Sequence, residues 1–219
     1  MSVELFENAP PLLPCEFFSL SCAVKYAPIS PAAPSSRSMR SSFILPDTSE
    51  LLGEEKFSEM ALCWSPEGLF LEVFVDKPFE EVYFPIFSKA DALELFFDTR
   101  DLKTAGFATR FCHHFVILPQ AVQEIHALEM THFRTEDTHP LCDPNELAVH
   151  TEFHKNSYSI RILIPGHCLH GFDPKVCDRI GFTYRIHRFG GQPQHFAVSS
   201  EHFAIEQSPR LWASLTMIK

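Results

Sequence analysis

Short runs in which apolar and polar side chains alternate fill most of the chain after residue 57, and this pattern limits what the chain can fold into. In residues 69–76 every second side chain is apolar, and Glu72 falls on the opposite side of the extended backbone. Residues 92–98 and 158–164 alternate in the same way. A period of two predicts strands with one buried face, and long amphipathic helices are absent from the pattern. A doubly wound α/β enzyme is therefore disfavoured.

The turns between these runs predict the architecture. A hairpin is predicted where Ser65, Pro66, Glu67 and Gly68 separate two apolar runs. Roughly eight short strands joined by turns are typical of a sandwich or barrel. We therefore predict an all-β fold, an immunoglobulin-like or jelly-roll-like β-sandwich of two antiparallel sheets with few short helical turns. The predicted strands are residues 57–64, 69–76, 92–98, 110–118, 147–153, 158–164, 180–187 and 211–218, while residues 120–132 fit either a short helix or an irregular strand.

The first part of the chain has a different composition. Residues 27–42 are rich in Pro and Ser, which sustain neither a helix nor a strand. We predict that residues 1–42 form an N-terminal arm that is partly extended or disordered, with residues 15–26 as a candidate for one stray strand. The sandwich is predicted to comprise residues 43–219.

Charge and composition argue against several classes of partner. The net charge of −10 and the lack of a basic patch argue against nucleic acid, which binds clustered Lys and Arg. No apolar run approaches the ~20 residues of a membrane-spanning helix, so membrane insertion is not expected. The seven cysteines form no CxxC pair, and the first residues lack the pattern of a signal peptide. We expect a cytoplasmic protein with reduced thiols.

Common motifs for catalysis and cofactor binding are absent from the sequence. It contains no serine-hydrolase elbow, no HExxH helix, no dinucleotide-binding glycine motif and no P-loop. We therefore predict no enzymatic activity and no cofactor. In the run Cys112, His113, His114, the first and third side chains share one face of a strand, where His187 is a candidate third metal ligand. Because such sites need at least three converging ligands, we favour hydrogen-bonded histidines and predict no metal site.

Four segments carry a particular order of strands and turns. They are CWSPEGLFLEVFVDK, DALELFFDTRDLKTAGFATRFCHHFVILP, YSIRILIPGHCLHGFDPKVCDRIGFTYRIHRFGG and SPRLWASLTMI, and they lie within residues 57 to 218. This order resembles the family-nine carbohydrate-binding modules and the related DOMON-like sandwiches. The second segment resembles stand-alone bacterial proteins of that type, which carry the module without an attached enzyme. The resemblance implies a β-sandwich with a non-catalytic binding function.

The family that this chain resembles binds sugar through tryptophan side chains. In family-nine modules that bind sugar, two exposed tryptophans clamp the pyranose ring. This chain has only two tryptophans, and both follow a core pattern. Trp64 alternates with Leu62 and Met60 along a strand, and Trp212 opens the last strand beside Leu211. We therefore expect both indoles to be buried, so that other side chains have to supply the aromatic faces that a sugar needs.

The candidate ligand-binding residues are Tyr83, Phe84, Phe87, Arg100 and Arg110. The three aromatic residues bracket a proline in the run VYFPIF, and the two arginines lie near the next turn. Aromatic faces stack on a sugar ring, and guanidinium groups donate hydrogen bonds to its hydroxyls. The alternative is structural: Phe84 and Phe87 plug the open end of the sandwich, and the arginines pair with nearby carboxylates to fix a loop.

Three functions from different classes follow from these features. The first is a binding module for a glycan or another small molecule, which the resemblance implies. The second is a protein-interaction or structural module that has lost sugar binding, which the missing tryptophan clamp and the Pro/Ser-rich arm favour. The third is a metal- or haem-associated domain, which the 12 histidines and the DOMON-like relation favour.

Overall fold

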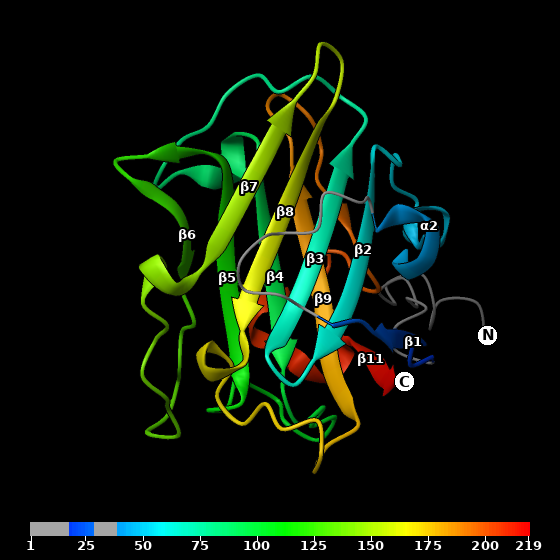
Figure 1. Ribbon diagram of the computed structural model, residues 1–219, viewed down its shortest axis with the longest axis vertical. Helices are drawn as coiled ribbons and strands as arrows, with labels where there is room; N and C mark the ends of the chain where they lie inside the picture. The colour runs from blue at the N-terminus through cyan, green and yellow to red at the C-terminus, as the bar shows by residue number, and fades with distance from the viewer. Residues whose placement is uncertain (1–17, 29–38) are drawn as a thin grey trace, which may run out of the picture.

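The computed structural model describes residues 18–28 and 39–219, and its strands form a sandwich of two layers (Figure 1). In these residues, one 11-stranded sheet has the order β6-β5-β4-β9-β11-β1-β2-β3-β8-β7, and β10 pairs with β9. The sheet folds over on itself, so that β2, β3, β8 and β7 form one layer and β11, β9, β4, β5 and β6 form the other. The all-β prediction is confirmed.

The bounds of the elements follow the predicted strands closely. The strands are β1 (Ser21–Tyr26), β2 (Ser58–Ser65), β3 (Gly68–Val75), β4 (Ala92–Asp98), β5 (Cys112–Val122), β6 (Ile125–Glu129), β7 (Ala148–Phe153), β8 (Tyr158–Pro165), β9 (Arg179–His187), β10 (Gln194–His195) and β11 (Ala213–Ile218). The helices are α2 (Arg40–Phe43) and α3 (Ser49–Leu52), with the 3₁₀ turns η1 (Phe87–Lys89), η2 (Pro144–Glu146), η3 (Gly166–Cys168), η4 (Ile205–Gln207) and η5 (Pro209–Leu211). None of the helices in the described part of the chain is long and apolar enough to cross a membrane.

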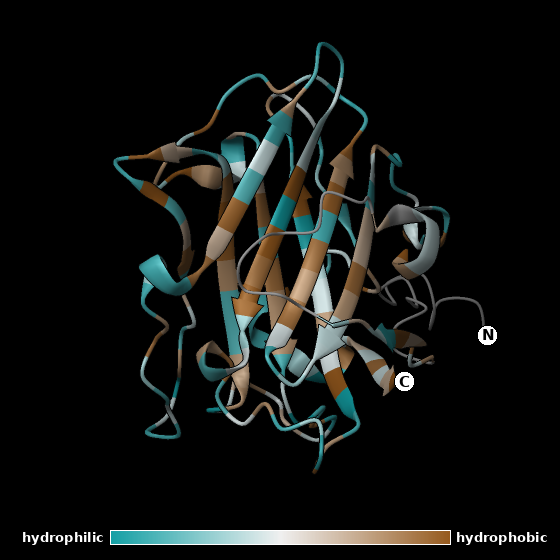
Figure 2. Cartoon of the chain, in the orientation of Figure 1, coloured by the Kyte–Doolittle hydropathy of each residue, from teal (hydrophilic) through white to brown (hydrophobic). Residues whose placement is uncertain are grey.

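Alternation along each strand places the core between the two layers. Leu95 and Phe97 of β4 pair with Tyr184 and Phe182 of β9, and all four side chains belong to the inner core. Figure 2 shows this alternation as brown bands separated by teal or pale ones along β3 and β8. Each large apolar side chain buried in this way contributes about 1.5–3 kcal/mol to stability.

β1 joins the two layers. It runs parallel to β11 on one side and parallel to β2 on the other, so the sandwich is one continuous sheet rather than the two separate antiparallel sheets that we predicted. Val24 of β1 is buried, and its carbonyl accepts a hydrogen bond of 3.0 Å from Nε1 of Trp64. Trp64 is 5% exposed, which confirms the core position predicted for it.

The position of β1 shows that the sandwich includes residues before the predicted start at residue 43. Residues 21–26 lie in the sheet, so this part of the predicted arm is an inner strand and not a stray one. The backbone N–H of Met39 donates to Oε2 of Glu72 at 2.6 Å, and Met39 packs on the outer face of β2 and β3. Residues 1–17 and 29–38 lie outside the described residues, and an extended or disordered state for them stays a prediction.

Residues 120–132, which fitted either a helix or a strand, form a hairpin of β5 and β6. Its turn residues, Gln123 and Glu124, have positive φ angles of 52° and 68°. Two-residue turns with positive φ at both positions match the twist of antiparallel strands. The hairpin extends this layer by one edge strand, β6.

Two chain segments cover the ends of the outer face of β4, β5 and β9. The segment between β3 and β4 packs Val82, Phe84 and Phe87 on one end of this face. The segment between β10 and β11 packs Val198 and Ile205 on the other end. The middle of the face, between these two apolar clusters, carries polar side chains.

Candidate functional site

Glu94 lies in the middle of the outer face of β4, β5 and β9. Its Oε2 lies 2.7 Å from Nε2 of His114 on β5, and its Oε1 lies 2.6 Å from both Nε of Arg185 and Nε2 of His187 on β9. The partners reach it from both sides because β4 lies between β5 and β9 in the sheet. The ring of Phe96 stacks on that of His114, with centroids 4.4 Å apart. We call these four polar residues the Glu94 cluster.

The Glu94 carboxylate stays ionised in this setting. The side chain is 1% exposed, and burial raises its pKa. The hydrogen bonds from His114, His187 and Arg185 outweigh burial and hold the pKa well below its usual range. A buried carboxylate of this kind is stable because each oxygen accepts hydrogen bonds from charged or polar donors.

Two partners of Glu94, Arg185 and His114, have nitrogen atoms that are not used in the contact with Glu94 and can hydrogen-bond to solvent or a ligand. Only Nε of Arg185 hydrogen-bonds to another residue in the described ranges, which leaves the donors on its two Nη atoms. In a neutral His114 the proton lies on Nε2 toward Glu94, so Nδ1 is an acceptor. The side chains of Arg185 and His114 are 18% and 15% exposed. The Glu94 cluster therefore offers both donors and an acceptor at the surface.

The predicted aromatic residues form one flank of this cluster. Phe84 and Phe87 are half-buried against Ala92, Val116 and Leu118 on the outer face, rather than in the open end of the sandwich. The ring of Phe87 meets the ring of His187 edge-on, with centroids 6.2 Å apart. Phe87 thus extends the polar cluster with an aromatic side chain.

Tyr83 lies at the rim of the same flank. It is 41% exposed, and its ring lies 6.4 Å from that of Phe189, which is also exposed. The opposite flank is built on Phe96 and Trp212, with the half-buried Phe203 against them. Trp212 is buried, as predicted, and its Nε1 donates to the carbonyl of Ile205 at 2.8 Å.

The predicted arginines lie elsewhere. Arg100 and Arg110 both stack on the ring of Phe111, with guanidinium carbons 5.3 and 5.2 Å from the ring centre. They follow the end of β4 and precede the start of β5, whereas Phe87 precedes β4. A strand of seven residues is about 20 Å long, so the aromatic residues and the arginines do not form one site. Their predicted proximity was wrong.

Asp98 fixes the loop that carries Arg100 through backbone groups, rather than through the predicted pairing with an arginine side chain. Asp98 ends β4, and its carboxylate accepts hydrogen bonds from the backbone N–H groups of Arg100 and Leu102, at 2.9 and 2.6 Å. Arg110 forms an ion pair of 3.4 Å with Asp137 at the surface. Both arginines therefore belong to the loops at the far end of this layer.

The sequence indicated part of the Glu94 cluster but not its composition. Alternation placed His114 with Cys112 on one face and suggested His187 as a third ligand. The structure does bring His114 and His187 together, on a carboxylate and without Cys112, whose Sγ lies 3.8 Å from Oγ1 of Thr109. Arg185 was missed, although it lies two residues before His187 and therefore on the same face of β9.

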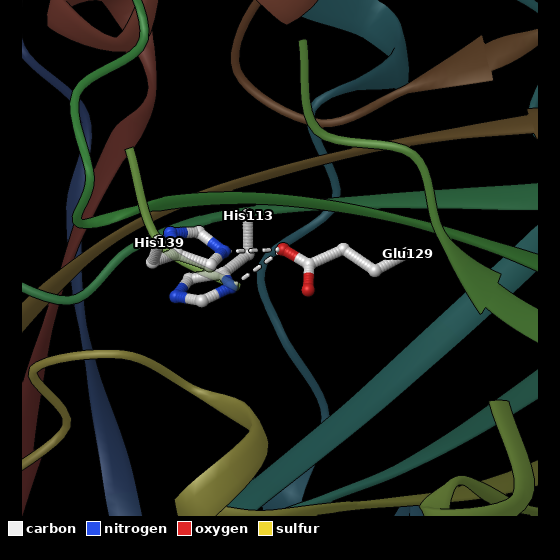
Figure 3. Close-up of side chains that lie close together, drawn as sticks. All are labelled: His113, Glu129 and His139. Carbon is white, nitrogen blue, oxygen red and sulfur yellow. Dashed lines mark hydrogen bonds and ion pairs between the residues drawn. The ribbon is translucent and has the colours of Figure 1, made fainter. Parts of the chain in front are cut away.

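A second glutamate–histidine cluster is buried on the other face of β5, around His113, and Figure 3 shows its side chains. Nδ1 of His113 and Nε2 of His139 lie 2.8 and 2.9 Å from Oε1 of Glu129. Oγ1 of Thr131 donates to the same oxygen at 2.6 Å, and the backbone N–H of Cys142 donates to Oε2 at 2.8 Å. We call His113, Glu129 and His139 the Glu129 cluster; their side chains are at most 1% exposed.

The distances in the Glu129 cluster are those of hydrogen bonds. Nδ1 of His139 lies 2.7 Å from the carbonyl oxygen of Arg110, so both ring nitrogens of His139 have hydrogen-bond partners. Burial raises the pKa of Glu129, but the hydrogen bonds from His113 and His139 outweigh it and lower the pKa to about 2. Tetrahedral zinc with such ligands would hold their donor atoms about 3.4 Å apart. The shorter contacts indicate a closed, structural cluster.

Comparison with solved structures identifies the fold. The chain is similar to a family-nine carbohydrate-binding module from Caldicellulosiruptor kristjanssonii in complex with glucose, with a TM-score of 0.64 and 12% identity over 90% of this chain and 95% of that one. A structure of such a module from the same organism with cellotriose gives a TM-score of 0.57 and 13% identity over 90% and 93%. A candidate carbohydrate-binding protein from Bacteroides uniformis ATCC 8492 gives 0.57 and 9% over 92% and 100%.

No family model and no curated protein sequence matches the chain. The similarity to solved structures is therefore one of fold. It agrees with the resemblance to family-nine carbohydrate-binding modules that the sequence indicated, and it extends over nearly all of the chain.

Proposed function

We propose that this chain, which has the fold of a family-nine carbohydrate-binding module, binds a saccharide on the outer face of β4, β5 and β9. The ligand would lie over the Glu94 cluster, beside the aromatic flank that contains Phe87. The observation that carries this proposal is the set of outward donors and acceptors on Arg185 and His114, which a buried carboxylate holds in place between two apolar clusters.

Sugar hydroxyls suit this arrangement because each hydroxyl both donates and accepts a hydrogen bond. Two neighbouring hydroxyls can accept from the two Nη atoms of Arg185, whose planar guanidinium fixes the direction of both bonds. Another hydroxyl can donate to Nδ1 of His114. Glu94 fixes both side chains before the ligand arrives, so little conformational entropy is lost on binding.

An aromatic face is the second requirement of a sugar site. Phe87 is half-buried beside His187, and Tyr83 and Phe189 lie exposed further along the same flank. These rings take the role that exposed tryptophans have in the sugar-binding family-nine modules. Phenylalanine and tyrosine offer smaller faces than tryptophan, so we expect weaker stacking.

The chemistry of Glu94 supports binding rather than hydrolysis. A glycosidase needs a protonated carboxylic acid beside a second carboxylate. Glu94 is held ionised by three hydrogen-bond partners, and its low pKa makes it a poor proton donor. We therefore propose a non-catalytic role. Because the similar structures contain glucose and cellotriose, gluco-configured sugars are the first ligands to test.

Isothermal titration calorimetry with glucose, cellobiose and cellotriose tests the proposal. We expect saturable binding by the full-length protein, and at least a tenfold loss of affinity in Arg185→Gln, which is about 1.4 kcal/mol. Arg179→Gln is the matched control, because Arg179 is an exposed arginine on the same strand, far from Glu94. Equal affinities of the two variants would contradict the proposed site, and a lack of saccharide binding across a broad glycan array would contradict the proposed function.

A further inference from the structure

Two cysteines and a glutamate come together on loops away from the Glu94 cluster. Cys142 precedes η2, Glu146 ends η2, and Cys168 ends η3 after β8. One donor atom from each residue lies within 4.8 Å of the other two. Cys168 is buried, Cys142 is half-buried and Glu146 is exposed, so the group is open to solvent on one side.

We propose that Cys142, Cys168 and Glu146 bind one Zn²⁺ ion, with a fourth position open to water. Thiolate sulfur and carboxylate oxygen are common zinc ligands, and three protein ligands leave one tetrahedral position free. The ligand set is independent of the saccharide site, since it lies at a different place in the fold and shares no residue with the Glu94 cluster.

The spacing of the donor atoms fits tetrahedral zinc. Bond lengths of about 2.3 Å to sulfur and 2.1 Å to oxygen place these two atoms about 3.6 Å apart around a tetrahedral ion. Sγ of Cys168 lies 3.5 Å from Oε2 of Glu146. This separation, that of a thiol-to-carboxylate hydrogen bond, matches the zinc geometry, and the donor atom of Cys142 lies within 4.8 Å of the other two. In the Glu129 cluster, by contrast, the contacts of 2.8 and 2.9 Å are too short for an ion between the ligands.

Neighbouring residues hold the ligands in place. Nε2 of His167 lies 3.2 Å from Oε1 of Glu146, so an imidazole orients the carboxylate from the side away from Cys168. The backbone N–H of Cys142 donates to Oε2 of Glu129 at 2.8 Å, which ties the Cys142 loop to the buried Glu129 cluster. Groups that orient metal ligands in this way raise metal affinity.

Neither thiol forms a disulfide in the described structure. Both are free, and burial raises the pKa of each. Zinc binding displaces the thiol protons and replaces them with a divalent charge that Glu146 helps to neutralise. An ion at this position would tie the segment between β6 and β7 to the turn that follows β8.

The test uses the untagged full-length protein, reduced and freed of metal, and titrated with Zn²⁺ against a fluorescent zinc chelator. We expect one Zn²⁺ per chain and a higher melting temperature with zinc than without. Co²⁺ in place of Zn²⁺ should give a thiolate-to-cobalt charge-transfer band in the near ultraviolet. Cys142→Ser and Cys168→Ser should abolish this band and lower zinc affinity at least tenfold.

Two further variants keep the test decisive if Cys168→Ser fails to fold. Glu146→Gln changes an exposed side chain and should still lower zinc affinity, and His167→Gln should lower it by about tenfold. Cys177→Ser is the matched control, because Cys177 is a half-buried cysteine on another loop. The proposal is overturned if Cys142→Ser and Glu146→Gln bind zinc as tightly as Cys177→Ser, or if Cys142 and Cys168 stay joined by a disulfide after treatment with a reductant.

Discussion

Two neighbouring histidines on β5 belong to two different clusters, one buried inside the sandwich and one on its outer face. His113 points into the sandwich and contacts Glu129, while His114 points outward and contacts Glu94. Both glutamates are buried, and both have a pKa lowered by hydrogen bonds from histidines. The clusters differ in solvent exposure: the side chains around Glu129 are enclosed by protein, whereas two of the side chains around Glu94 reach the surface. This difference separates a group that stabilises the fold from a group that is arranged to bind.

The Glu129 cluster is closed by the protein itself. Its carboxylate accepts from two imidazoles, a hydroxyl and a backbone N–H, and Nε2 of His113 is buried without a hydrogen bond in the described part of the chain. In the Glu94 cluster the far ends of Arg185 and His114 reach the surface. The same residue types therefore have a structural role on one face of β5 and an expected ligand-binding role on the other.

The largest effect is expected from Glu129→Gln. Removal of this charge deprives two buried imidazoles, a hydroxyl and a backbone N–H of their shared charged partner, and breaking such a buried network costs about 3–5 kcal/mol of unfolding free energy. Urea unfolding at neutral pH measures the loss, with Glu124→Gln as a control because Glu124 is exposed in the turn of the same hairpin. Saccharide affinity of the folded fraction should not change. If this variant lost affinity but not stability, the roles of the two clusters would be reversed.

Acid should remove nearly as much stability through the same residue. The pKa of Glu129 is about 2 in the folded protein and about 4.3 in the unfolded chain. Its stabilising contribution is therefore complete above about pH 4.3 and is lost as the pH falls toward 2, by about 3 kcal/mol in all. Unfolding curves across this range should show the wild-type protein and Glu129→Gln converging in stability at low pH. A constant gap between them would count against an ionised Glu129.

A smaller change in stability, with a clear change in binding, is expected from Glu94→Gln. Solvent can replace Glu94 as the partner of Arg185 and His114, while the more buried His187 loses its partner, so we expect a cost of about 1–3 kcal/mol. Affinity for saccharide should fall at least tenfold, because neither side chain is then held in place. Calorimetry and urea unfolding of the same sample separate the two effects. A stability loss as large as that of Glu129→Gln, with unchanged affinity, would remove the distinction between the clusters.

The smallest effect is expected at the aromatic flank. Replacement of Phe87 by Leu keeps apolar volume but removes a ring, which is worth about 0.5–1.5 kcal/mol, or roughly a two- to tenfold loss of affinity. Phe153→Leu is the control, since Phe153 is an exposed phenylalanine on β7 in the other layer. Equal affinities of the two variants would show that Phe87 serves only to cover the sheet.

Sequence patterns were informative where neighbours in space are neighbours in sequence. Alternation predicted the strands and put His113 and His114 on opposite faces, because the side-chain period of a strand is two. It could not predict that β9 lies beside β4, since this pairing depends on strand order. Arg185 was therefore missed, while Arg100 and Arg110 were chosen for their closeness along the chain. Both arginines lie in the connection between β4 and β5, at the opposite end of β4 from the aromatic residues.

The parallel position of β1 has a consequence for how the protein folds. Ser21 pairs with Ser214, so one of the first strands to be synthesised has its partner in the last strand of the chain. Contacts between segments so distant in sequence raise the contact order, and such folds form slowly. Until β11 pairs with its two neighbours, β1 and β9 present unpaired strand edges that can pair with another chain. Closure of the sandwich through β1 therefore depends on a strand about 190 residues further along the chain.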